Sequence, residues 1–398
     1  MRLPLSFNYF FLYGICFSLF IYGITWLPFS SAIRFIGLSF VAAFLAFNKN
    51  QQLFNLKFVS FILFIAVNNI LFSLDMLVSY RSLLILIVVL AIEFMITRKV
   101  TIEERLKSIC IVLRLFFVIS ILAYISGDSR VSDNIYGNDT LITGNAFSGV
   151  FESVNYFFFF LYVYQFLILI QKSSLKDKFF DIFIIILIYG IIFIVFLQIN
   201  RTFILSNLVF IYFYLFKDYF TVTFKLIISF FILAIVISII EIESDLLQIY
   251  GIKISDILEY GIFGNRTILW AASIDAIIDN NLIFYGNGLG NQKLMLSTYD
   301  LTGVEGLHAH STYFGILLDF GVIPSLIILS YIFISSFNNL IKYRDIYKID
   351  LFPFFFGLMV FSIFDSIFIE GFNSGHFIVF TLFVFSGLLP NHQTVIKK

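Results

Sequence analysis

The stretch Gly286–Gly321 reads GNGLGNQKLMLSTYDLTGVEGLHAHSTYFGILLDFG and divides a chain that is apolar almost everywhere else. It passes from a glycine-rich turn through a polar loop to His308 and His310, and then enters an apolar helix. The whole chain is 60% hydrophobic and contains 56 Phe, against 13% charged residues. A water-soluble domain cannot bury that much apolar surface, so we predict an all-α integral membrane protein. Polar residues that gather in one stretch of such a chain need a reason.

Runs of about 20 mostly apolar residues predict about twelve membrane-spanning helices in a single transmembrane domain, 1–398. The predicted spans are 5–27, 29–47, 54–74, 77–97, 106–126, 149–170, 179–199, 202–216, 222–240, 310–337, 351–370 and 373–390. With the N-terminus inside, most of the 25 Lys and Arg residues fall in segments that alternation also places inside. This bias follows the positive-inside rule and predicts a multi-pass protein with both termini in the cytoplasm. The net charge of zero gives no indication of a nucleic-acid partner.

Two outer loops interrupt the predicted spans, at 127–148 and 241–309. The first is rich in Gly, Asn and Asp and has no periodicity, so we predict turns there. The second contains GNRTILWAASIDAIIDNNL (264–282), which predicts an amphipathic helix with Arg266 and Trp270 on one face. Because this helix has few charges and one apolar face, we expect it to lie on or dip into the membrane interface.

Ionisable residues at membrane depth are costly and face the interior of a helical bundle. For Arg114 we favour a structural role. The last predicted spans carry the acids Asp319, Asp365 and Glu370, and we expect two of them to lie deep enough to need partners. We favour pairing with arginines of other spans, and a proton relay in a transporter is the alternative. Gly321 and Pro324 are expected to bend the tenth predicted span.

Arg201 occupies a very short outer turn, QINRTF (198–203), together with Asn200. Two interpretations are open. Arg201 is either an interfacial anchor that departs from the positive-inside trend or a fixed cation facing a lipid phosphate. Arginine suits the second role because its planar guanidinium binds phosphate through two hydrogen bonds and keeps its charge.

The turn Gly286–Gly290 carries Gly288 and Gly290 and lacks the βαβ unit that a dinucleotide site requires. We interpret it as a backbone turn able to approach a ligand closely. His310 stands at the start of the tenth predicted span, on one face with Tyr313, where free backbone N–H groups favour an anion. The two histidines have neither a cysteine nor a His-Glu-x-x-His motif beside them, so we predict no metal and no cofactor. Helix capping is the alternative role for both histidines.

Three groups of residues resemble motifs of the O-antigen polymerase and O-antigen ligase superfamily, the multi-span glycosyltransferases of bacterial surface polysaccharide assembly. They are Asn200-Arg201-Thr202, Arg266-Thr-Ile-Leu-Trp270 with Gly286-Asn-Gly-Leu-Gly290, and His310-Ser311-Thr312-Tyr313-Phe314. Their order and the large late outer loop are also similar to the family. The chain departs from the family's pattern with Ser311 where Asn is usual and Phe314 where Leu is usual.

The resemblance implies inverting, metal-independent transfer of a growing glycan from undecaprenyl diphosphate on the periplasmic side of the bacterial inner membrane. Undecaprenyl-diphosphate-linked oligosaccharide is the expected donor and acceptor. The bilayer is a further partner, and the resemblance leaves room for a chain-length regulator protein. Arg201 and Arg266 are expected to stabilise the leaving diphosphate, and His310 to take the proton of the acceptor hydroxyl. The residues expected to bind substrate are Trp270, Gly288, Gly290, Tyr313, His308 and Asn200.

We favour a polymerase over a ligase, which transfers glycan to the lipid A core. The Phe-, Ile- and Asn-heavy composition is typical of AT-rich polysaccharide gene clusters. A flippase or transporter of lipid-linked oligosaccharide is the alternative from a different class. It would place ionisable residues along a path at the membrane midplane and show repeat symmetry, whereas here the polar residues gather at one face.

Overall fold

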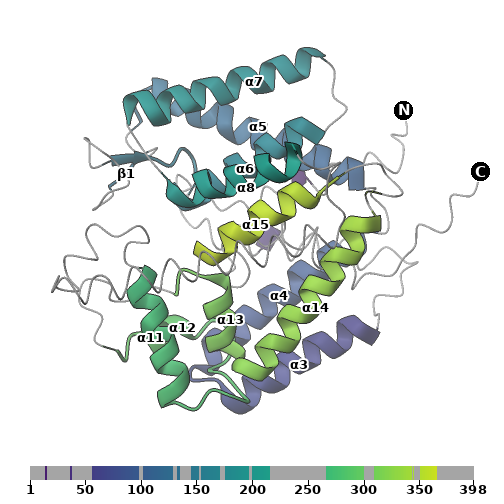
Figure 1. Cartoon of the computed structure of the whole chain (residues 1–398), viewed down its shortest axis with the longest axis vertical. Helices are drawn as coiled ribbons and strands as arrows, with labels where there is room; N and C mark the ends of the chain where they lie inside the picture. The colour runs from purple at the N-terminus through teal and green to yellow at the C-terminus, as the bar shows by residue number, and fades with distance from the viewer. Residues whose placement is uncertain are drawn as a thin grey trace, which may run out of the picture.

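The computed structural model describes residues 14–15, 36–37, 56–97, 102–128, 132–134, 145–151, 154–170, 175–196, 200–215, 266–299, 309–342, 344 and 350–364. This part of the chain is mostly helical, as predicted (Figure 1). The ninth and twelfth predicted spans, nearly all of the first and second, the loop before Arg266, and His308 lie outside the described residues.

The described helices follow the predicted spans closely. They are α3 Leu56–Phe72, α4 Met76–Thr97, α5 Ile102–Ile125, α6 Val154–Ile170, α7 Leu175–Gly190 with the π-helical turn η2 Ile191–Val195, α8 Arg201–Leu215, α13 Thr312–Phe320, α14 Val322–Lys342 and α15 Phe352–Phe364. Two segments of the described chain, Glu103–Ile125 and Asp177–Val195, are long and apolar enough to cross a membrane. They support membrane association weakly, and the twelve-span topology stays a prediction.

The loop predicted at 127–148 contains two short strands, β1 Ser132–Asn134 and β2 Asn145–Phe147, which pair antiparallel with Ser132 opposite Phe147. The prediction that this loop consists of turns was wrong at these residues. The ring of Phe147 is buried and contacts the rings of Tyr124 and Phe196. Strands of three residues are too short to leave a periodic pattern in the sequence. Tertiary packing, here of Phe147, decides that such strands form.

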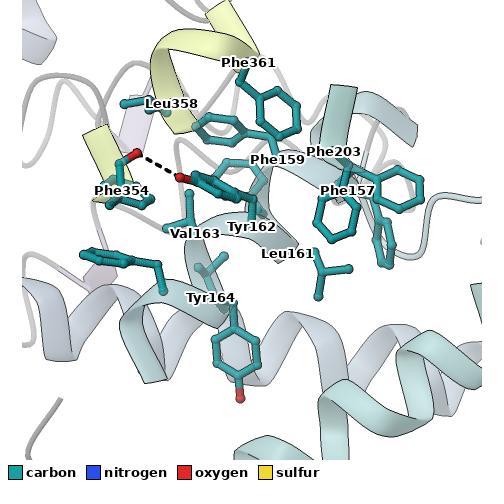
Figure 2. Close-up of a cluster of buried hydrophobic side chains, with 14 of the residues drawn as sticks. Phe157, Phe159, Leu161, Tyr162, Val163, Tyr164, Phe203, Phe354, Leu358 and Phe361 are labelled. Atoms are coloured by element: carbon teal, nitrogen blue, oxygen red, sulfur yellow. Dashed lines mark hydrogen bonds between the residues drawn. The ribbon is translucent and has the colours of Figure 1, made fainter. Parts of the chain in front are cut away.

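Helices α6, α8 and α15 lie together in the middle of the molecule in Figure 1, with α5 and α7 on one side and α3, α4, α11, α13 and α14 on the other. They pack against one another through aromatic rings, and we call this contact region the aromatic interface (Figure 2). Phe354 stacks on both Phe166 and Tyr162, with ring centroids 4.2 and 5.3 Å apart. The Tyr162 hydroxyl donates a hydrogen bond of 2.8 Å to the Phe354 carbonyl. Many such ring pairs, each modest in energy, hold these helices.

Arg114 of α5 forms an ion pair between helices. Its Nε and Nη2 atoms lie 2.6 and 2.8 Å from the two carboxylate oxygens of Asp181 in α7. The Tyr164 hydroxyl of α6 donates to the same carboxylate at 2.6 Å. A bidentate arginine–carboxylate pair with an additional hydrogen bond compensates both charges where they are shielded from water. The structural role predicted for Arg114 is confirmed.

The tenth predicted span is two helices rather than one bent helix, because α13 ends before Gly321 and α14 begins after it. Gly321 adopts a positive φ of 84°, which the helix cannot continue through. The segment 282–290 covers the break. The N–H groups of Val322 and Ile323 donate to the carbonyls of Leu282 and Ile283, each at 2.9 Å.

The carbonyls at the end of α13 are covered by the same segment. The N–H groups of Asn287 and Gly288 donate to the carbonyls of Leu318 and Asp319 at 2.9 and 3.0 Å. Backbone groups freed where a buried helix breaks need such partners. The glycine-rich segment therefore has a structural task at the break.

Candidate functional site

Helix α11 runs from Arg266 to Asp279 and confirms the helix predicted at 264–282. Its apolar side packs on α13 and on the short helix α12, Gln292–Leu296, through residues that form one buried cluster. The members of this cluster are Leu269, Ala272, Ala276, Leu282, Met295, Leu296, Ala309 and Leu318. The expectation that α11 lies on or dips into the membrane interface stays a prediction, and Ile274 and Ile278 of α11 remain exposed.

Tyr299, three residues after α12, hydrogen-bonds to the C-terminal end of α11. Its hydroxyl donates to the Asp279 carboxylate at 3.2 Å, and Asn280 Nδ2 lies 3.3 Å from the same hydroxyl. Burial, followed by the hydrogen bond to Asp279, raises the pKa of the Tyr299 hydroxyl. Tyr299 is therefore a neutral donor over the ordinary pH range.

Trp270 joins α11 to the residue before His310. Its indole Nε1–H donates a buried hydrogen bond of 3.1 Å to the Ala309 carbonyl. Its ring is 5% exposed and stacks on Phe314 of α13, with centroids 5.8 Å apart. Arg266, half-buried, lies one helical turn before Trp270, on the same face of α11. Helix α11 therefore carries both Arg266 and the indole that bonds to the residue before His310.

His310 lies outside α13, which begins at Thr312 after Ser311 in an extended conformation (φ −154°, ψ 128°). His310 itself has a φ of 45°, in the left-handed region, and its side chain is half-buried. The prediction that His310 shares a helical face with Tyr313 was therefore wrong. Histidine is among the few non-glycine types enriched in this region, but the conformation still costs about 1 kcal/mol or more. The surrounding contacts must hold it.

Tyr313 connects α13 to α15. Its hydroxyl accepts a hydrogen bond of 3.0 Å from Ser362 and lies 3.5 Å from the sulfur of Met359. The substrate-binding role predicted for Tyr313 stays a prediction, and the structure gives its hydroxyl a contact with α15.

The start of α8 is fixed by Asn200. Its Oδ1 accepts from the Phe203 N–H at 2.8 Å, as an N-cap does, and its Nδ2 donates to Asn155 of α6 at 3.3 Å. Arg201 is the first residue of α8, and its side chain lies outside what the structure describes. The substrate roles predicted for Asn200 and Arg201 stay predictions.

The structure links the elements that carry the three predicted catalytic residues. Helix α11 contacts α13, α13 contacts α15, and α15 packs along α8. The ring of Phe361, near the end of α15, contacts Phe159 in the first half of α6, the helix that carries Asn155. The start of α8, the end of α15 and the start of α13 therefore lie at the same end of the bundle. This brings the elements of Arg201 and His310 to one side, and Trp270 of α11 hydrogen-bonds to Ala309, the residue before His310.

Gly288 and Gly290 lie against the α3–α4 turn, each with a φ of 85°. A Cβ atom at Gly288 would lie 2.7 Å from the Ser79 hydroxyl, and one at Gly290 would lie 2.6 Å from that of Ser82. The close approach predicted for this turn is therefore an approach to the chain itself. Their role in binding substrate stays a prediction.

Polar side chains of the α3–α4 region hold this turn, and the sequence analysis missed them. Asn69 Oδ1 accepts from the Leu289 N–H at 2.9 Å, and Asn68 Nδ2 donates to the Asp319 carbonyl at 3.3 Å. Asn291 Nδ2 lies 3.0 and 2.8 Å from the hydroxyls of Ser73 and Ser79. The signal that could have found them is the pair Asn68-Asn69 inside an apolar run, because amide side chains in apolar helices form hydrogen bonds to neighbouring elements. We call these residues with Gly286–Gly290 and Asp319 the polar junction.

The described residues hold no group of three or more His, Cys, Asp or Glu side chains able to bind a metal ion. The metal-independent reaction nevertheless stays a prediction. No protein-family model matches the chain, and no curated protein matches it.

Proposed function

We propose that this protein is a surface-polysaccharide polymerase, a membrane glycosyltransferase that joins undecaprenyl-diphosphate-linked oligosaccharides at the periplasmic face of the bacterial inner membrane. One observation carries the proposal. The Trp270 indole bonds to the carbonyl before His310, so two of the three motifs, distant in sequence, meet at one place. A shared site for a basic side chain and an imidazole is what the reaction requires.

The proposed topology has twelve spans, both termini in the cytoplasm and the loops 127–148 and 241–309 in the periplasm. Contacts among segments assigned to the outer face support it. The Leu74 N–H, in the α3–α4 turn, donates to the Asn287 carbonyl at 2.9 Å. The Asn155–Asn200 hydrogen bond joins two further outer ends. Alternating helices bring such ends together on one side.

In the proposed reaction, an acceptor hydroxyl oxygen attacks the anomeric carbon of the donor from the side opposite the diphosphate. The new carbon–oxygen bond forms as the bond between the anomeric carbon and the phosphate oxygen breaks. The electron pair of the broken bond leaves with the diphosphate. Arg201 and Arg266 stabilise the charge that develops there. His310 takes the hydroxyl proton. A single displacement inverts the anomeric centre.

The replacement of His310 by Asn tests the base directly. Asn tolerates the left-handed conformation that His310 adopts and lacks a group basic enough to take the proton. We expect H310N to reach the membrane at the wild-type level and to lower polymerisation by about 10²- to 10⁴-fold. Glycan ladders from cells and joining of purified lipid-linked units in detergent measure this loss.

The matched control is His392→Asn, a substitution of the same type in the C-terminal tail, which should leave the ladder unchanged. A normal ladder in H310N would remove the imidazole from the mechanism. A deletion strain separates the alternatives: loss of a polymerase leaves single repeat units on the lipid A core, while loss of a ligase leaves long glycan on undecaprenol. Joining of units by the purified protein excludes transport as its sole activity.

A further inference from the structure

We infer that Trp270 is a positioning residue that holds His310 in its left-handed conformation, rather than a platform on which a sugar ring stacks. The inference rests on the proposed function, in which His310 is the base. It replaces the substrate-binding role expected for Trp270 with a role that depends on the indole N–H.

The surroundings of the indole argue against sugar stacking. A stacking platform offers one ring face to the ligand, but the Trp270 side chain is 5% exposed and packs against Phe314. The indole has one polar group, the Nε1–H, and this group is engaged by the Ala309 carbonyl at 3.1 Å. The side chain is therefore committed to the protein.

The position of the Trp270–Ala309 hydrogen bond explains how the indole constrains the φ angle of His310. The Ala309 carbonyl and the His310 N–H belong to one planar peptide unit. Fixing the carbonyl oxygen fixes the plane from which the φ rotation of His310 starts. Ala309 is fully buried, so this plane is held in place by packing as well as by the indole.

The other side of His310 is held by the first turn of α13. The Gly315 N–H donates to the Ser311 carbonyl at 2.9 Å as α13 begins. The indole thus fixes the chain before His310 and the start of α13 fixes it after, and the φ of 45° lies between these two fixed points. A strained conformation persists where its surroundings determine it from both sides.

Two substitutions in the full-length protein separate the N–H from the ring. W270F removes the donor and leaves an aromatic ring against Phe314, whereas the matched control F314L removes the stacking partner and leaves the donor. With lipid-linked units from a strain that cannot polymerise them, we expect W270F to lower kcat by about 10- to 100-fold, because the base is displaced. KM should not change, and F314L should retain most of the wild-type kcat.

A double-mutant cycle with H310N provides the readout that a merely structural role would not move. A residue that acts through His310 has no further effect once the imidazole is absent, so W270F should cost nothing in the H310N background. An equal loss from W270F in both backgrounds would overturn the inference, as would W270F and F314L behaving alike.

A second measurement needs no activity. In a variant whose other histidines, His308, His376 and His392, are replaced by Asn, the rate of diethylpyrocarbonate modification reports on His310 alone. We expect W270F to change this rate and F314L to leave it unchanged, and an unchanged rate in W270F would overturn the inference. If H310N polymerises normally, the proposed function fails, and the modification rate still decides whether Trp270 holds His310.

Discussion

The aromatic interface and the polar junction hold neighbouring helices by opposite means. In the aromatic interface, the single residue Phe354 contacts two other rings, and α6, α8 and α15 are joined by many further ring pairs. In the polar junction, Asn69 and Asp319 each bind one backbone N–H of the glycine-rich turn, at Leu289 and Gly290. The first region is redundant, whereas the second depends on single directional bonds.

This difference indicates where the molecule tolerates change. Dispersion contacts between rings are individually weak and spread over many atoms, so the loss of one is shared by its neighbours. A buried N–H that loses its acceptor keeps the full desolvation cost. We therefore expect substitutions in the polar junction to be more destabilising than substitutions of comparable size in the aromatic interface.

Gly286→Ala tests the polar junction most severely. A Cβ atom at this position would overlap the backbone of Asp319 and Phe320, which cannot move without opening the helix break. We expect a loss of about 3 kcal/mol in the free energy of unfolding, because overpacking against backbone is not relieved by a rotamer change. Thermal unfolding of the purified protein in detergent measures this loss.

Gly190→Ala is the matched control, since it adds the same methyl group in helical backbone where nothing lies within 4 Å. It should raise stability by about 0.5–1 kcal/mol, the usual advantage of Ala over Gly inside a helix. Equal melting temperatures for the two variants would contradict the close packing of Gly286 against the backbone of Asp319 and Phe320.

The helices of the described chain were predictable because long apolar runs and a 3.6-residue period persist over many residues. The need for glycine between Gly286 and Gly290 was also predictable from its spacing. What these glycines approach was not, because the sequence does not say which element lies opposite. Asn69 lies 220 positions from Leu289 and Asn68 lies 251 positions from Asp319, and only the tertiary fold brings these partners together.

Asp319→Ala tests the junction at its one carboxylate. Asp319 is fully buried, and its Oδ2 accepts from the Gly290 N–H at 3.1 Å. Removing this acceptor should cost about 1–3 kcal/mol, the penalty of a buried N–H without a partner. Unfolding of the purified variant measures the loss.

Asp319→Asn is its matched variant, because the amide retains an acceptor oxygen of the same reach. It should lose less stability than Asp319→Ala. If Asp319→Asn abolished glycan ladders in cells without loss of stability, this would instead favour the proton relay that a transporter requires.

The candidate site was predicted by residue type but not by conformation. His310, Trp270 and Arg266 were singled out from motifs, and the structure joins their elements. The left-handed backbone of His310 could not be predicted, because the φ angle of one residue depends on contacts such as the Trp270–Ala309 hydrogen bond. The start of α13 at Thr312 follows from the same constraint, since no helix includes a residue with a φ of 45°.

Tyr162→Phe tests the aromatic interface with the smallest of these changes. The hydroxyl that donates to the Phe354 carbonyl is lost, while the ring stays stacked on Phe354 (Figure 2). We expect a loss of about 1 kcal/mol, the net worth of an ordinary hydrogen bond, because the stacked rings keep the helices in place. Unfolding under the conditions used for Asp319→Ala gives the comparison. A loss from Tyr162→Phe as large as that from Asp319→Ala would mean that the aromatic interface also depends on single directional bonds, and the distinction between the two regions would then fail.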